Sequence, residues 1–206
     1  MNKIKQIIIV ALMVQTAQGN FMARLTKLRN ILPYIYAAKK TGKVWWVTDI
    51  DETLVKVLPK QYKPMEKDTV NTFIQAQKEV KITGLTSTDQ HYIFALLILL
   101  KKQGITFPGF SHAAIPTPLN PPVHFNEKVA IHTLLYGDVI FTNMSKGQAL
   151  IDYLKMYEDQ GKTLPDTIIF SDDKKSNIEN VFKEVPKVFT DITIIGLDYF
   201  PENNDE

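Results

Sequence analysis

One stretch of the chain decides the fold, and it reads Trp45-Trp46-Val47-Thr48-Asp49-Ile50-Asp51-Glu52-Thr53-Leu54-Val55. It begins as an apolar run rich in β-forming residues and ends in two carboxylates that stand two positions apart. Because alternate residues of a strand point to the same side, Asp49 and Asp51 are expected to project together where the strand ends. Ligands of parallel α/β sheets bind at this carboxyl end. The repulsion between two such acids predicts a divalent metal beside them, the alternative being a solvated acidic turn.

Polar groups also follow three later segments that are predicted to be strands. Each of these groups, which include hydroxyls, a lysine and two acids, could be part of a binding site. Each could instead have a purely structural role: hydroxyls cap helices, a long lysine side chain reaches water, and acids are favoured in the first turn of a helix. A lysine at a helix start opposes the helix dipole, which indicates an anion nearby. The groups are Thr86, Ser87 and Thr88 after residues 80–85, Lys146 after 138–142, and Asp172 and Asp173 after 167–171.

Predicted strands and helices alternate along most of the chain. This order predicts an α/β fold of three layers, with a mostly parallel central sheet between helices. The strand ends that carry Asp49, Thr86, Lys146 and Asp172 are then expected to meet at one edge of the sheet. The gaps between the first three of these residues are too short for a large cap domain, so at most a small flap is predicted.

The order of these groups resembles the four motifs of the haloacid dehalogenase superfamily, in its phosphatase-type form, over about residues 44–198. Asp49-Ile50-Asp51-Glu52-Thr53 is similar to the first motif and also to the start of secreted class C acid phosphatases. The adjacent acids at 172 and 173 depart from the class C pattern. The runs 144–150 and 170–177 are most similar to a bacterial branch of the superfamily whose function is uncharacterised.

The resemblance implies a Mg²⁺-dependent phosphomonoester hydrolase that works through an aspartyl-phosphate. It implies that Asp49 is the nucleophile, that Asp51 is the general acid and base, and that Lys146 neutralises charge. Thr86 and Ser87 would bind the phosphoryl oxygens. Mg²⁺ would be held by Asp49, the main-chain carbonyl of Asp51, and Asp172 and Asp173. Two alternatives stay open: a non-catalytic binding or effector protein of the same fold, and a phosphotransferase.

The first 19 residues have the pattern of a signal peptide. Lys3 and Lys5 precede an apolar run, Ile7 to Val14, and small residues follow at Ala17-Gln18-Gly19. The run is short for a membrane span, so an exported protein, periplasmic or secreted, without stable membrane association after cleavage is expected. The remaining organisation is predicted as a helical segment at 20–43, a catalytic domain at 44–200 that contains a proline-rich loop or flap at 105–135, and an acidic tail at 201–206.

Composition excludes several classes of function. The chain has 24 basic and 22 acidic residues, and removal of Lys3 and Lys5 would balance them. No basic cluster of the kind that binds nucleic acid is present, so the expected partner is a small phosphorylated substrate. The chain has no cysteine, which excludes disulfides and thiolate chemistry. The sequence indicates no particular oligomeric state.

Overall fold

A computed structural model of the chain describes residues 19–58, 61–88, 92–109, 117–119, 123–125, 128–130 and 133–201. The predicted signal peptide lies outside these ranges apart from Gly19, and the predicted acidic tail lies outside them apart from Pro201. The prolines at 116, 121 and 122 also lie outside, whereas the core of the predicted catalytic domain is described.

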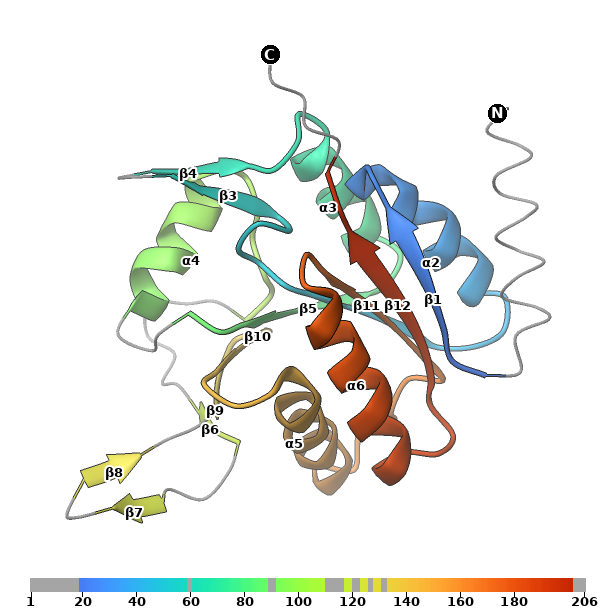
Figure 1. Cartoon of the computed structure of the whole chain (residues 1–206), viewed down its shortest axis with the longest axis vertical. Coiled ribbons are helices and arrows are strands. Elements are labelled where there is room, and N and C mark those ends of the chain that lie inside the picture. The colour runs from blue at the N-terminus through green and yellow to red at the C-terminus, as the bar shows by residue number, and fades with distance from the viewer. Residues whose placement is uncertain are drawn as a thin grey trace.

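The described strands form an eight-stranded central sheet (Figure 1). The first six strands in sheet order are parallel to one another, and the last two are attached by antiparallel pairing. This confirms the predicted α/β class with its mostly parallel sheet. In sheet order the strands are β1 (Phe21–Leu25), β12 (Thr193–Tyr199), β11 (Thr167–Asp172), β2 (Val44–Thr48), β5 (Lys81–Thr86), β10 (Val139–Thr142), β9 (Thr133–Tyr136) and β6 (Thr117–Pro118).

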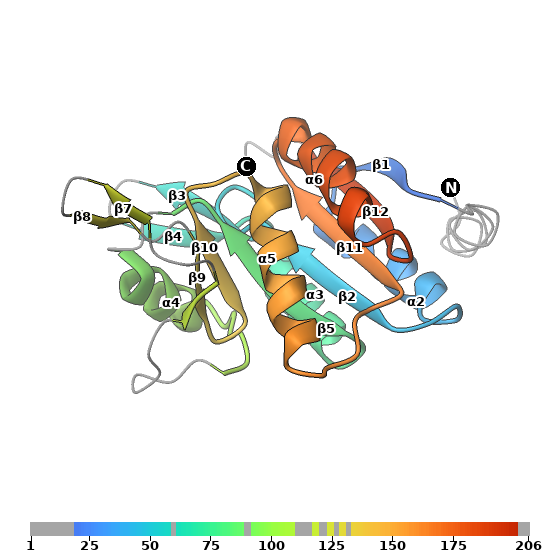
Figure 2. The same ribbon diagram turned by 90° about the horizontal axis from the view of Figure 1, so that it is seen from below.

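Helices cover both faces of the sheet, as Figure 2 shows. One face packs against the short helix η1 (Leu28–Ile31) and against α2 (Leu32–Ala38), α3 (Thr69–Gln77) and α4 (Ile93–Lys102). The other face packs against α5 (Lys146–Asp159) and α6 (Lys175–Val188). Trp46 belongs to the first core and Trp45 to the second, because successive side chains of β2 point to opposite faces. No helix of the described residues is both long and apolar enough to cross a membrane.

The additions to the sheet are small in the described parts of the chain. A hairpin of β3 (Val55–Leu58) and β4 (Gln61–Pro64) follows Asp51. A second two-stranded sheet pairs β7 (Val123–Phe125) with β8 (Lys128–Ala130), inside the predicted proline-rich flap. Both pairs fit the expectation of a small flap in place of a large cap.

The prediction of a helical segment at 20–43 is wrong at its start. Residues Phe21–Leu25 form the edge strand β1, which pairs in parallel with β12. The Asn20 side chain accepts a hydrogen bond from Ile194 N at 2.7 Å, which ties the residue before β1 to β12. Phe21 and Leu25 fit both a helical and an alternating pattern, and pairing with β12 decides between them. Pro33 lies in the first turn of α2, where its missing N–H is tolerated.

Candidate active site

Four strand ends lie next to one another because β11, β2, β5 and β10 are neighbours in the sheet. Asp49 directly follows β2, Thr86 ends β5, and Asp172 ends β11. Lys146 begins α5, shortly after β10. Parallel strands finish at the same edge of a sheet, so the strand order brings these four residues to one place.

Lys146 joins the strands that carry two of the acids. Its Nζ donates a hydrogen bond to Asp49 Oδ1 and another, at 2.7 Å, to Asp172 Oδ2. The lysine side chain is only 3% exposed. Burial opposes the charge of this lysine, but the two carboxylates outweigh burial, and the pKa of Lys146 is raised. The position of Lys146 at a helix start predicts a nearby anion, and the structure places two there, the carboxylates of Asp49 and Asp172.

Asp172 accepts three further hydrogen bonds, from two donor groups. Its Oδ1 accepts a hydrogen bond from the main-chain N–H of Lys174 at 2.9 Å. The side-chain amide of Asn177 reaches both carboxylate oxygens, at 3.0 and 3.1 Å. The sequence analysis does not predict Asn177 as a site residue, although it lies with Asp172 in the run 170–177. An amide five residues after the acid, on the first turn of α6, is the signal that identifies it.

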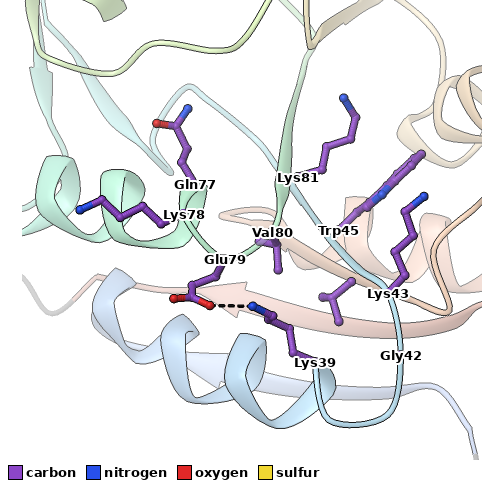
Figure 3. Close-up of a pocket in the computed structure, with 10 residues that line it drawn as sticks. Lys39, Gly42, Lys43, Trp45, Gln77, Lys78, Glu79, Val80 and Lys81 are labelled. Atoms are coloured by element: carbon purple, nitrogen blue, oxygen red, sulfur yellow. Dashed lines mark hydrogen bonds and ion pairs between the residues drawn. The ribbon is translucent and has the colours of Figure 1, made fainter.

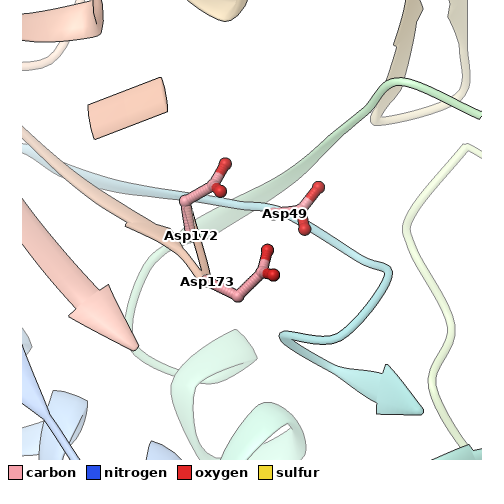
Figure 4. A group of neighbouring side chains, drawn as sticks. All are labelled: Asp49, Asp172 and Asp173. Carbon is pink, nitrogen blue, oxygen red and sulfur yellow. The ribbon is translucent and has the colours of Figure 1, made fainter. Parts of the chain in front are cut away.

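Three carboxylates gather at the ends of β2 and β11 (Figure 4). One oxygen from each of Asp49, Asp172 and Asp173 lies within 4.8 Å of the others. Burial raises the pKa of Asp49 to about 7, with Asp172 and Asp173 adding to the rise and Lys146 opposing it. The pKa of Asp173 is also raised, by burial and by Asp172. Clustered carboxylate oxygens with excess negative charge are the donors that hard divalent cations take, so these three residues could hold a metal ion.

The raised pKa of Asp49 predicts how the stability of the metal-free protein depends on pH. Its pKa is about 3.9 when unfolded and about 7 when folded, so folding favours the protonated acid. This contribution to stability is complete below the unfolded pKa and is lost as pH rises through 7. With EDTA present, we expect the Tm of the protein to fall between pH 5 and 8, and Mg²⁺ at pH 8 to restore it. A Tm that is flat over this range in EDTA would contradict the proposed environment of Asp49.

Asp51 lies outside the group of three carboxylates. Its Oδ2 accepts a hydrogen bond from Thr88 Oγ1 at 2.6 Å and a longer one from Thr86 Oγ1 at 3.3 Å. Its Oδ1 is buried and has no hydrogen-bond partner in the described chain. Ser87, on the same turn, is exposed. The two acids of Asp49-Ile50-Asp51 are therefore held in different surroundings, one among charges and one among hydroxyls.

A tight turn over residues 50–55 begins directly after Asp49 and contains Asp51. The main-chain N–H groups of Leu54 and Val55 both donate to Ile50 O, at 2.9 and 3.1 Å, and Ile50 itself is buried. Glu52 adopts a left-handed backbone with a φ of 60°, which is uncommon for a residue with a side chain. The Thr53 hydroxyl reaches back to Asp49 Oδ2 at 3.4 Å. The turn thus sends the Asp51 side chain toward β5 while Asp49 stays beside β11.

A buried chain of hydrogen bonds ends on the main-chain carbonyl of Asp49 and fixes its position. Trp46 Nε1 donates to Ser171 Oγ, Ser171 Oγ donates to Thr48 Oγ1, and Thr48 Oγ1 donates to Asp49 O, each at 2.9 Å. Asp49 N also donates to Ser171 O at 2.9 Å. All three side chains are fully buried. Both main-chain groups of Asp49 are therefore fixed relative to β11, which carries Asp172 on the next residue.

A groove of about 510 Å³ lies at the opposite, amino-terminal edge of β2 and β5 (Figure 3). Lysines line it, but most of them have partners within the fold. Lys39 pairs with Glu79 at 2.6 Å, and Lys81 pairs with Asp138. Lys43 donates to a main-chain carbonyl, that of Thr163. None of the acids of the candidate site lines this groove, so the groove is separate from the carboxylate cluster.

Comparison with known proteins assigns the chain to a family. A family model described as a protein of unknown function, DUF2608, matches residues 57–206. The chain belongs to the DUF2608 family. The matched DUF2608 region contains Thr86, Lys146, Asp172 and Asp173, and it begins after Asp49 and Asp51. No curated protein matches the chain.

Proposed function

We propose that this DUF2608 protein is a Mg²⁺-dependent phosphomonoester hydrolase of the haloacid dehalogenase type. The observation that carries the proposal is that the carboxylates of Asp49 and Asp51 have different surroundings. One carboxylate is buried against Lys146 and beside two further acids, and the other is held apart by hydroxyls. A nucleophile that attacks phosphorus and an acid that serves the leaving group need such different surroundings. The parallel sheet, with its acids at the carboxyl edge, is compatible with this type of fold.

The first half of the reaction transfers the phosphoryl group to the protein. A carboxylate oxygen of Asp49 attacks phosphorus, and the bond between phosphorus and the ester oxygen breaks. Asp51 gives its proton to that oxygen, which leaves as an alcohol. Lys146 offsets the negative charge that Asp49 and the phosphoryl oxygens bring together. The Thr86 hydroxyl, at the end of β5, would bind a phosphoryl oxygen in place of its long, 3.3 Å hydrogen bond to Asp51 Oδ2.

The second half returns Asp49 to its starting form. Asp51, now a carboxylate, takes a proton from water while the water oxygen attacks phosphorus. The bond between phosphorus and the Asp49 oxygen breaks, and inorganic phosphate leaves. Asp49, Asp172 and Asp173 would hold Mg²⁺, which supplies the positive charge that lets an anionic nucleophile approach an anionic ester.

Sequence features outside the site support two further parts of the proposal, the location of the protein and the class of its substrate. The basic start and the short apolar run of residues 1–19 support export, periplasmic or secreted, with no stable membrane association after cleavage. The balanced charge of the remaining chain supports a small phosphorylated substrate over nucleic acid.

The test is turnover of p-nitrophenyl phosphate by the purified protein with Mg²⁺. We expect release of p-nitrophenol and phosphate, loss of both in EDTA, and recovery when Mg²⁺ is returned in excess. Added ethanol or glycerol separates hydrolysis from transfer, because a phosphotransferase would form a new ester in place of phosphate. Metal-loaded protein that releases no product from a broad panel of phosphate esters would overturn the proposal and favour a binding protein.

A further inference from the structure

Both oxygens of the Asp172 carboxylate already accept two hydrogen bonds each. Oδ1 accepts from the main-chain N–H of Lys174 at 2.9 Å and from Asn177 Nδ2 at 3.0 Å. Oδ2 accepts from Lys146 Nζ at 2.7 Å and from Asn177 Nδ2 at 3.1 Å. A carboxylate has about four lone-pair positions, so these contacts take up the accepting capacity of Asp172, which is fully buried. A metal ion can bind Asp172 only if one of these donors gives way.

Lys146 is the donor that a metal ion would replace. The N–H of Lys174 is fixed by the main chain and the Asn177 amide is neutral, whereas Lys146 carries a positive charge on a long side chain. Its Nζ bonds to Asp49 Oδ1 and Asp172 Oδ2, which belong to two of the three clustered carboxylates. An ammonium therefore already lies where a divalent cation is expected. Two cations on the same carboxylates repel each other, and water screens this repulsion poorly around a side chain that is only 3% exposed.

We propose that Lys146 is the resident cation of the metal-free site and that Mg²⁺ and a phosphate anion bind there as a pair. Lys146 gives up Asp172 Oδ2 when Mg²⁺ binds, and its freed ammonium then contacts an oxygen of the anion. The inference rests on the proposed hydrolase function for the identity of the metal and the anion. By formal charge, three carboxylates and one ammonium leave two negative charges, which repel phosphate until Mg²⁺ balances them.

The exchange of partners by Lys146 links the two ligands. An anion that draws Lys146 away from Asp172 makes room for the metal, and a metal that displaces Lys146 supplies an ammonium to the anion. Each ligand therefore strengthens the binding of the other by the same factor. The opposite view is that Lys146 organises the acids and so helps the metal to bind. Removal of the lysine charge distinguishes the two views, because Mg²⁺ should bind more tightly if Lys146 competes and more weakly if it organises.

The test is calorimetric titration of the purified protein with Mg²⁺ at pH 8, with and without inorganic phosphate. For the unchanged protein, we expect phosphate to lower the Kd of Mg²⁺ on the order of 10-fold, within the range typical of coupled sites. For Lys146→Met and Lys146→Gln, we expect Mg²⁺ alone to bind on the order of 10-fold more tightly than it binds the unchanged protein, because the competing charge is gone. The effect of phosphate on the Kd of Mg²⁺ should be smaller in both variants.

Controls separate the possible failures. Lys146→Gln retains an amide that donates to the carboxylates, so it keeps the test open if Lys146→Met does not fold. Lys155→Met, at an exposed position of α5, should bind Mg²⁺ like the unchanged protein. Mg²⁺ binding to folded Lys146→Gln that is unchanged or weaker, or no Mg²⁺ binding to any of these proteins, would overturn the inference. Turnover plays no part in the test, so linked binding by a protein that hydrolyses no ester would overturn the proposed hydrolase alone.

Discussion

Asp49→Asn is expected to abolish turnover of phosphate esters while leaving the fold intact. The amide is a poor nucleophile, and loss of a covalent nucleophile lowers kcat by roughly 10⁴–10⁶-fold. The same change removes a buried charge from beside Asp172 and Asp173, whose repulsion contributes to the raised pKa of Asp49. The free energy of unfolding in EDTA at pH 8 should therefore stay the same or increase. Initial rates with p-nitrophenyl phosphate and urea titrations measure the two effects.

A matched control for this variant is Asp159→Asn. Asp159 is exposed at the end of α5, so its neutralisation should change neither rate nor stability. Turnover by Asp49→Asn at more than a hundredth of the normal rate would rule out Asp49 as the nucleophile. A large loss of stability in EDTA would show instead that its charge holds the fold together.

Lys146→Met should reduce both stability and turnover. Methionine has a similar length but no charge, so the carboxylates of Asp49 and Asp172 would lose their buried cationic partner. Removing one partner of a buried ion pair destabilises a protein by about 3–5 kcal/mol. We expect a loss of that order in EDTA at pH 8, partly recovered by Mg²⁺ or by lowering the pH to 5. Loss of preorganised charge lowers kcat on the order of 10²–10³-fold.

Lys155→Met, at an exposed position on the same helix, is the control for this second variant. It tests whether loss of any lysine from α5 lowers stability. An unfolding free energy of Lys146→Met in EDTA that equals that of Lys155→Met would mean that the two buried ion pairs contribute nothing. Failure of Mg²⁺ to recover stability would mean that the acids around position 146 do not bind the metal.

The strands with continuous apolar runs could be predicted from the sequence because buried parallel strands have a strong local pattern. Residues 44–48 and 167–171 are such runs, and their order along the chain was sufficient to predict that Asp49 and Asp172 finish at one edge. Strand β1 could not be recognised in this way. Phe21, Leu25 and Leu28 suit a helix by spacing, and only the edge of β12 makes the strand the better structure.

Contacts between distant residues were harder to predict than strands. The turn at 86–88 was recognised as rich in hydroxyls, but nothing in its local sequence says that Thr88 reaches Asp51. The same holds for Asn177, whose position relative to Asp172 depends on how α6 starts. Lys146 can be recognised from the sequence because a lysine at a helix start opposes the helix dipole. This conflict is visible before the fold is known.

The hydrogen bond from Trp46 to Ser171 gives the protein a built-in optical reporter. The chain has two tryptophans, and the other, Trp45, packs in the core on the opposite face of the sheet. A Trp45→Phe protein would carry a single tryptophan, whose indole N–H donates to Ser171, the residue before Asp172. Its emission and lifetime would then follow events at the carboxyl edge without any attached dye, and stopped-flow traces could resolve metal entry from ester binding.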